Sequence, residues 1–347
     1  MSTNPLIQDL IQNEAFPSVT IAFPTGGRWY DKGIISDEAD PMDIEVGVLG
    51  MLAEQNYRDP WLMLSGESIP RMLKSICPSV ISASDLCEID LDAILLAARL
   101  VSYGSRLELH HICREPKKEE KTEDKPKKKI KQSMKEAVEV VQTLCAFENV
   151  VVVDINEHIL RYDVITDAII AEKFVHKLSR VNQTVHLRPM TYGRVISQIK
   201  AGMTREKELN KMVDVQIDAL VTDPDSIKQY VKIIDLASDN AIDNIAAAIH
   251  CIETTTGKMV NGNEFIREWI LTLPTDEADA LVKKINSMVE WFQSFSDITY
   301  DCAECGSKQT FRLELNADQL FGQAEDSQPP KKPSRKSKKG GRRRKIQ

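Results

Sequence analysis

Two cysteines near the C-terminal end of the chain, separated by two residues, constrain the fold more than any other feature. The run Cys302-Ala303-Glu304-Cys305-Gly306 places two thiols on one side of a tight loop, and the glycine permits the left-handed bend that such a loop requires. The apolar and aromatic residues on both sides predict paired strands. This is the layout of a zinc knuckle. A tetrahedral structural site needs four ligands, so one knuckle supplies half a site.

The first half of the chain offers the other two ligands. A predicted strand runs into Cys113, as another runs into Cys302. Cys145 and Cys305 each precede an Asn by eleven positions, with a strand predicted in between. We therefore interpret Cys113 and Cys145 as the two halves of a first knuckle that has been split open.

This correspondence predicts one site that joins the two halves of the chain, with zinc as a structural ion because four thiolates leave no open position for water. His110 or His111 would replace Cys145 if that residue lies too far away. The predicted ligands are Cys113, Cys145, Cys302 and Cys305.

Two other interpretations of these cysteines stay open. Cys145 lies among apolar residues and could be a plain core residue, because free cysteine is often buried. The pair Cys302 and Cys305 could instead be redox-active. The remaining cysteines, at positions that we expect to be buried in helices, receive no role; they are Cys77, Cys87 and Cys251.

The charge of the chain is unevenly distributed. The 347 residues carry a formal net charge of -7, but residues 329–347 contain ten bases and no acid, so the rest of the chain stands at -7 - 10 = -17. We expect this basic tail to be disordered, since it has almost nothing apolar to bury. It could be an electrostatic arm for nucleic acid or an acidic protein, or only a solubilising tail. Its cations are Lys331, Lys332, Arg335, Lys336, Lys338, Lys339, Arg342, Arg343, Arg344 and Lys345.

The order of the predicted elements indicates an α+β protein, mostly helical, with small antiparallel sheets. The charged stretch 114–136 is read as an inserted loop. The predicted division is an N-terminal lobe (1–113), this insertion, a second and helical lobe that ends in the knuckle (137–326), and the tail (327–347). A weak internal echo relates the two lobes.

The predicted secondary structure rests on periodicity and on end signals. Helices are expected at 49–56, 68–76, 90–103, 191–201, 205–219, 224–236, 239–254, 263–272 and 276–294. Strands are expected at 19–23, 42–46, 107–112, 150–155, 185–189, 297–300 and 310–315.

No familiar catalytic or nucleotide-binding motif is present, and the six histidines are scattered. Asp90 and Asp92 lie at a helix start, where carboxylates stabilise the helix dipole, so they need no catalytic role. No apolar run is long enough for a membrane helix, and the first residues lack a secretion signal. We therefore expect a soluble, intracellular protein without enzymatic activity and without membrane contact.

Three segments, taken in order, resemble the baseplate hub proteins of T4-like contractile-tailed bacteriophages. The first is Phe23-Pro24-Thr25-Gly26-Gly27-Arg28-Trp29-Tyr30 with Gly33. The second is the helix end Ala97–Gly104, followed by a strand into cysteine. The third is the knuckle at Cys302 and Cys305 with Phe311 and Leu313, closing on Leu320-Phe321. The opened first knuckle and the basic tail depart from the family pattern.

The resemblance implies a structural or assembly component of the tail baseplate hub, which binds hub, spike and tape-measure proteins. It would be found in the host cytoplasm during assembly, or in the baseplate of the virion. The alternative is a zinc-ribbon regulator that binds nucleic acid through the basic tail, although an acidic body opposes phosphate binding elsewhere. A thiol redox protein is a third option.

Overall fold

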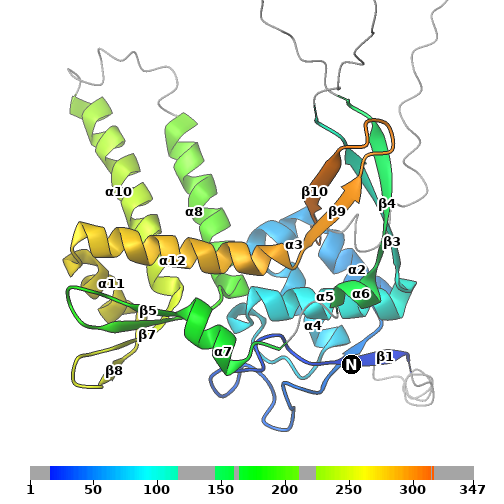
Figure 1. Ribbon diagram of the computed structural model, residues 1–347, viewed down its shortest axis with the longest axis horizontal. Helices are drawn as coiled ribbons and strands as arrows, with labels where there is room; N and C mark the ends of the chain where they lie inside the picture. Colours follow the sequence, from blue (N-terminus) through cyan, green and yellow to red (C-terminus); the bar gives the residue numbers. More distant parts are fainter. Residues whose placement is uncertain (1–15, 116–144, 160–163, 211–223, 314, 316–347) are drawn as a thin grey trace, which may run out of the picture.

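The computed structural model describes residues 16–115, 145–159, 164–210, 224–313 and 315 (Figure 1). Helices predominate, and the strands form one four-stranded and three two-stranded antiparallel sheets, so the predicted α+β class is confirmed. The basic tail and most of the 114–136 insertion lie outside the described residues. Within the described part, every helix is too short or too polar to cross a bilayer.

The N-terminal part is a sheet of two strands covered by helices. Alternation places Ile44 and Val46 of one strand in the core, while Glu45 between them is exposed. The longest helix of this part, α5, contributes a continuous buried stretch from Ile89 to Arg99 except for half-buried Asp92, and ends at Gly104 with φ +83°. The elements are β1 (Ser18–Ile21), β2 (Ile44–Gly47), α2 (Met51–Arg58), α3 (Pro60–Ser65), α4 (Ser68–Ile76), η1 (Ala83–Asp85) and α5 (Glu88–Tyr103).

The second part is built on the four-stranded sheet, whose strand order is β5-β6-β7-β8. Its core contains Phe174 and Val185, and α12 adds Leu281, Ile285 and Met288 at the spacing of one helix face. The elements are α7 (Asp167–Ile169), η2 (Ile170–Phe174), β5 (Val175–Lys177), β6 (Thr184–Leu187), α8 (Tyr192–Asn210), α10 (Pro224–Ala247), β7 (Ile249–Glu253), β8 (Met259–Val260), α11 (Asn263–Thr272) and α12 (Thr275–Ser294).

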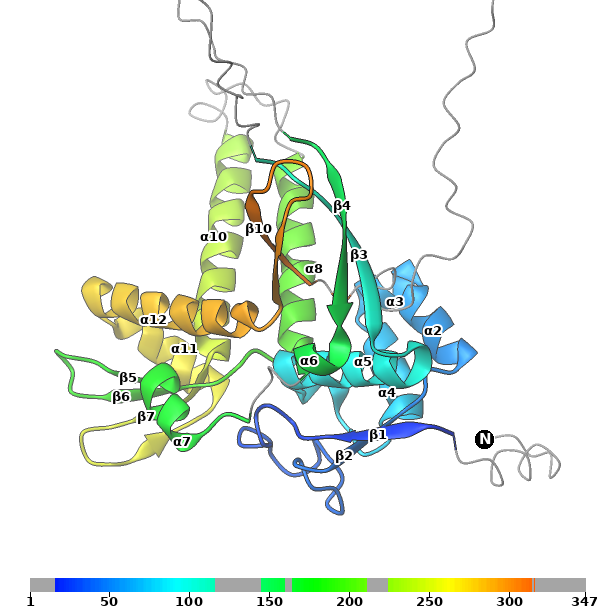
Figure 2. The same ribbon diagram turned by 45° about the vertical axis from the view of Figure 1, so that its right-hand side comes forward.

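Two β-hairpins stand side by side on α5 (Figure 2). Their inward residues Leu107, Leu109, Ile298 and Leu313 pack with Leu96 of α5 in a core of their own. This cluster gives the hairpins a common base, and both point the same way from it. The first hairpin pairs β3 (Arg106–Ile112) with β4 (Glu148–Asp154), and the second pairs β9 (Asp297–Asp301) with β10 (Lys308–Arg312). Strand β4 leads into the short helix α6 (Ile155–Ile159).

One predicted helix is wrong. The segment 239–254 is not a separate helix, because α10 continues without a break to Ala247 and residues 249–253 form β7. The helical pattern of the alanines extends to the end of α10, but Ile249 and Ile252 are buried where β7 pairs with β6. Pairing with β6 therefore determines the strand conformation of residues 249–253, and local periodicity carries no information about such a distant partner.

The three cysteines without an assigned role are all buried, as expected, but none of them lies within a helix as predicted. Cys77 follows the last turn of α4 and Cys87 precedes the first turn of α5. Cys251 lies in strand β7 and not in a helix. The predicted helix at 205–219 coincides with the end of α8 as far as Asn210, and its remainder lies outside the described residues.

Asp90 does more than stabilise a helix dipole. It is fully buried on α5, and its carboxylate accepts hydrogen bonds from the amide of Thr25 (2.9 Å) and from the hydroxyls of Thr25 and Tyr30. Tyr30 also accepts from the amide of Cys87 (3.0 Å). A single carboxylate therefore fixes the Pro-Thr-Gly-Gly segment against the helix. Burial raises the pKa of Asp90 to about 6, because it outweighs these hydrogen bonds.

We predict that Asp90 makes the protein less stable as the pH rises. The folded state holds the proton more tightly than the unfolded chain, so Asp90 contributes stability below pH 4 that is lost as the pH rises through 6. At 1.36 kcal/mol per pKa unit, the loss is about 3 kcal/mol. Denaturant unfolding at pH 4 and pH 7 should show that the stability of wild type relative to Asp90→Asn falls by this amount. Glu45→Gln, at an exposed carboxylate, is the control and should show no such trend; equal differences at both pH values would contradict the prediction.

Candidate metal centre

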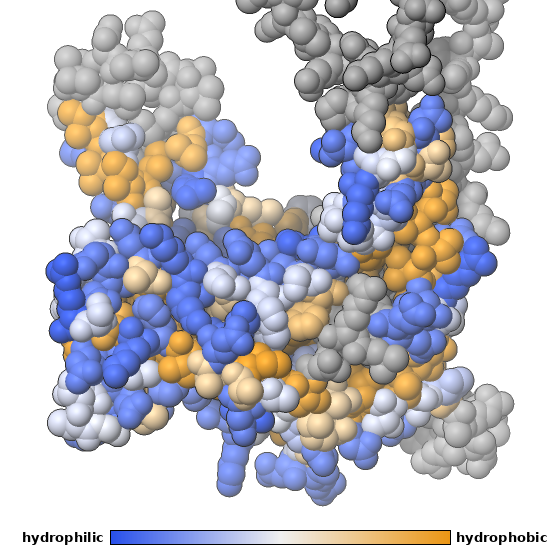
Figure 3. Space-filling view, in the orientation of Figure 1, coloured by the Kyte–Doolittle hydropathy of each residue, from blue (hydrophilic) through white to orange (hydrophobic). Residues whose placement is uncertain are grey.

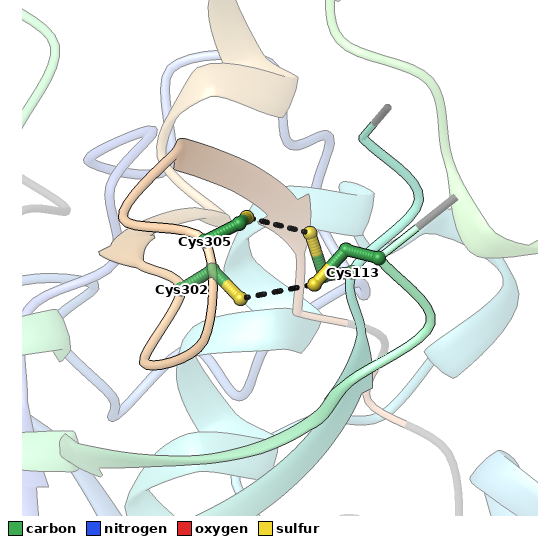
Figure 4. A group of neighbouring side chains, drawn as sticks. Cys113, Cys302 and Cys305 are labelled. Carbon is green, nitrogen blue, oxygen red and sulfur yellow. Dashed lines mark hydrogen bonds between the residues drawn. The ribbon is translucent and has the colours of Figure 1, made fainter. Parts of the chain in front are cut away.

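The four predicted ligands meet at the tips of the two hairpins. The sulfurs of Cys113 and Cys305 are 3.7 Å apart, those of Cys145 and Cys302 are 3.9 Å apart, and all four lie within 4.8 Å of one another. Figure 4 shows the thiols of the two hairpins facing each other. Tetrahedral zinc with bonds of about 2.3 Å separates its sulfurs by about 3.8 Å, whereas a disulfide needs about 2.05 Å. The spacing fits a shared metal ion, and all of these cysteines are free.

Both hairpins close with the same pair of backbone hydrogen bonds. In the first, the amide of Cys113 donates to the carbonyl of Phe147 (2.9 Å), and the amide of Ala146 donates back to the carbonyl of Cys113 (2.9 Å). In the second, the amide of Cys302 donates to Ser307 (2.9 Å), and that of Gly306 donates back to Cys302 (2.8 Å).

The residue after the second cysteine is left-handed in each hairpin. Gly306 has φ +63°, and Ala146 has φ +51°, a region that costs an L-residue roughly 1 to 2 kcal/mol. The backbone thus reproduces the predicted correspondence of Cys113 with Cys302 and of Cys145 with Cys305. The first knuckle keeps the geometry of a compact one, although the chain between its two cysteines is long.

The local environment sets the acidity of the thiols. Backbone amides of Cys305 and Glu304 donate to the sulfur of Cys302 and lower its pKa, and hydrogen bonds from Ser307 lower the pKa of Cys305. Burial raises the pKa of Cys145. Amide donors therefore favour thiolates in the second knuckle, and a buried cation is the natural means of ionising Cys145 as well.

Asn149 links the two hairpins by hydrogen bonds next to the sulfurs. Its side-chain oxygen accepts from the amide of Ala303 (3.0 Å), and its amide nitrogen lies 3.5 Å from the sulfur of Cys302 as a donor. Gln309 occupies the same offset, four residues after the second cysteine, but its side chain donates only within its own hairpin, to Ser307 (3.2 Å) and to the carbonyl of Lys308 (3.3 Å). Both residues are buried.

The substitute histidines are engaged elsewhere. His111 stacks on Phe311, with ring centroids 4.7 Å apart, and its Nδ1 is 2.7 Å from the hydroxyl of Tyr300. His110 is exposed and contacts Glu148 (3.0 Å). Neither belongs to the cysteine cluster.

The sequence pattern alone did not identify Asn149, Gln309, His111 and Tyr300 as supporting residues. One signal was their equal spacing, since Asn149 and Gln309 each lie four residues after the second cysteine of a hairpin. Similarly, His111 and Tyr300 each lie two residues before the first cysteine. That signal becomes visible only once the two knuckles are aligned.

This group of thiols could hold a metal ion. Among the residues that the structure describes, it is the group in which at least three histidine, cysteine or carboxylate side chains approach closely enough to do so. Three of its cysteines are buried and Cys305 is partly exposed. With four sulfurs around one point, the arrangement has the closed character of a structural site.

Comparisons of the chain with protein-family models, with curated proteins and with solved structures give no match.

We predict that Asn149→Ala weakens metal binding about 10- to 100-fold, the usual cost of losing a group that orients a ligand. Its loss removes a hydrogen bond to the Cys302 sulfur and the link to Ala303. Competition with a chromophoric zinc chelator measures the affinity. Thr310→Ala is the control, because the exposed Thr310 hydroxyl lies against that of Thr299 (3.2 Å) on the second hairpin, and this variant should bind nearly as tightly as wild type. An equal effect of both substitutions would contradict the role of Asn149.

Proposed function

We propose that the four cysteines hold one structural zinc ion as thiolates and thereby fasten the β3–β4 hairpin to the β9–β10 hairpin. The observation that carries this proposal is the spacing of the sulfurs, 3.7 and 3.9 Å across the two hairpins. A bound zinc ion would neutralise thiolates that otherwise repel one another at this distance. The thiolates would come from Cys113, Cys145, Cys302 and Cys305.

A structural role fits these cysteines better than redox exchange. A redox-active pair needs one exposed thiol with a resolving partner, usually at a helix N-terminus. Here Cys113 and Cys302 follow β-strands, Cys145 lies shortly before β4 and Cys305 lies between β9 and β10. Three of the four are buried. A closed set of four sulfurs suits permanent cross-linking.

We further propose that the protein is a non-enzymatic component of a contractile phage tail baseplate hub, which binds other tail proteins during assembly. The proposal rests on the three resembling segments, and their positions support it. The first segment is fixed to α5 through Asp90, and the helix end of the second leads directly into β3. The third is joined to the strand of the second through the cysteines. The described parts of the three segments form one continuous region, and Leu320-Phe321 of the third lie outside the described residues.

The charges on the hairpins disfavour the alternative of a nucleic-acid-binding zinc ribbon. Strands β3 and β4 and the segment 297–312 carry three bases and six acids, so the surface around the cysteines would repel phosphate. On this alternative, the basic tail would be the arm that binds nucleic acid. The bases are Arg106, Lys308 and Arg312, and the acids are Glu108, Glu148, Asp154, Asp297, Asp301 and Glu304.

The metal assignment predicts one zinc ion per chain after purification without added metal. Cys113→Ser and Cys305→Ser, one substitution in each knuckle, should each lower the zinc content and the thermal midpoint, because three thiolates hold the ion less tightly. Elemental analysis and thermal unfolding measure the two effects. Cys251→Ser, at a buried cysteine in β7 outside the cluster, should keep its zinc. Unchanged zinc content in both knuckle variants would refute the assignment.

The assembly role predicts discrete complexes with other tail proteins. Co-expression with the hub, spike and tape-measure proteins of the same phage, followed by size-exclusion chromatography, should yield a complex of fixed composition that withstands moderate salt. Deletion of residues 329–347 tests the alternative. Binding to nucleic acid that falls steeply with salt and disappears on this deletion, without any complex among the tail proteins, would support the regulator instead.

A further inference from the structure

A pair of helices projects from the body well away from the cysteine cluster. Helices α8 and α10 lie side by side and point the same way out of the molecule in both views (Figures 1 and 2). At their base, Gln198 donates to the side chain of Asn244 (2.8 Å), and Arg194 reaches the same oxygen (3.2 Å). Further out, Lys232 pairs with Glu208 (3.5 Å). The two helices are therefore fixed to each other along their length.

The outer half of this pair leaves large apolar side chains in solvent. Figure 3 shows hydrophobic residues gathered over the projecting helices. On α10 the exposed positions 227, 230, 231 and 234 follow the spacing of one face of a helix that packs against another helix. The exposed residues, each between 41% and 51% accessible, are Ile199, Met203, Leu209, Ile227, Tyr230, Val231 and Ile234.

The exposed apolar area is large enough to matter. Seven side chains that are each nearly half exposed offer on the order of 600 Å² on one molecule, so two such faces would bury about 1,200 Å², the lower limit of a specific interface. Single exposed apolar residues are ordinary on protein surfaces, whereas a continuous patch of this size marks an interaction site.

The charge of the segment indicates which partner can approach. The described residues 199–210 and 224–236 carry five bases and four acids, a net charge of +1, in a chain whose residues outside the basic tail stand at -17. Two copies of so acidic a body repel each other at most orientations. At the outer half of α8 and α10 that repulsion is small, so this is a surface where a second copy can approach closely.

We propose that this face binds the same face of a second copy of the chain, so that two α8–α10 pairs form a four-helix bundle. A pair of packed helices with an apolar face is half of such a bundle, and a two-fold axis makes the face complementary to itself. Tyr230 and Ile234 lie in the stripe of α10, and Ile199 and Met203 contribute from α8. This dimer surface is separate from the proposed zinc site and does not depend on it.

Sedimentation velocity of the full-length protein over a wide range of concentration tests the proposal. The 39.1 kDa chain should convert to a species of twice that mass as the concentration rises. The double variant Tyr230→Glu/Ile234→Glu should raise the dissociation constant at least tenfold, because it places charges within the buried stripe. Circular dichroism and zinc content should match those of wild type, since both side chains face solvent.

The matched control is Phe265→Glu/Leu271→Glu, which alters two side chains of α11 that are exposed at 64% and 69%. This variant should dimerise as wild type does. Cross-linking of mixed isotope-labelled and unlabelled protein should join Lys228 of one copy to lysines of α8 in the other. A protein that is monomeric at every concentration, or a dimer that the Tyr230→Glu/Ile234→Glu variant leaves intact, would overturn the proposal. Neither result would alter the zinc content, so the dimer proposal and the zinc proposal can be refuted independently of each other.

Discussion

The contact between sulfurs of two distant hairpins is the constraint on which the arrangement depends. Cys113 and Cys305 lie 192 positions apart in sequence, and the short β-strands that carry them would be marginally stable alone. Side-chain packing against α5 supports their bases, while Asn149 and the cysteines join their tips. A ligand set of this kind converts the free energy of metal binding into stability of the fold.

A second buried polar centre lies in the first turn of α5. Asp90 fixes the segment around Thr25 and Tyr30, and Tyr30 packs with both the N-terminal core and the core beneath the hairpins. Helix α5 therefore binds the N-terminal segment through hydrogen bonds to the Asp90 carboxylate and binds the hairpins through apolar contacts. These contacts also hold the Phe23–Tyr30 segment, the end of α5 and the cysteine hairpins in one region of the fold.

Sequence reasoning predicted what local pattern and equal spacing encode. It gave the helices at 68–76 and 263–272 with their bounds, and it brought Cys113 to Cys302 by comparing two strands that each end in cysteine. It failed where distant pairing decides, since residues 249–253 became a strand beside β6. It also explained Asp90 by the helix dipole alone, because no local signal shows that Thr25 and Tyr30 lie against that carboxylate.

The positions of the four thiols do not depend on how long the chain between Cys113 and Cys145 is. The amide of Cys145 donates to the carbonyl of Glu115 (2.8 Å), so the ladder is already closed where the intervening residues begin and end. Loop-closure entropy grows only with the logarithm of length, and doubling such a loop costs about 0.6 kcal/mol. This junction is thus a permissive site, where an epitope or a fluorescent domain could be grafted while the thiols keep their positions.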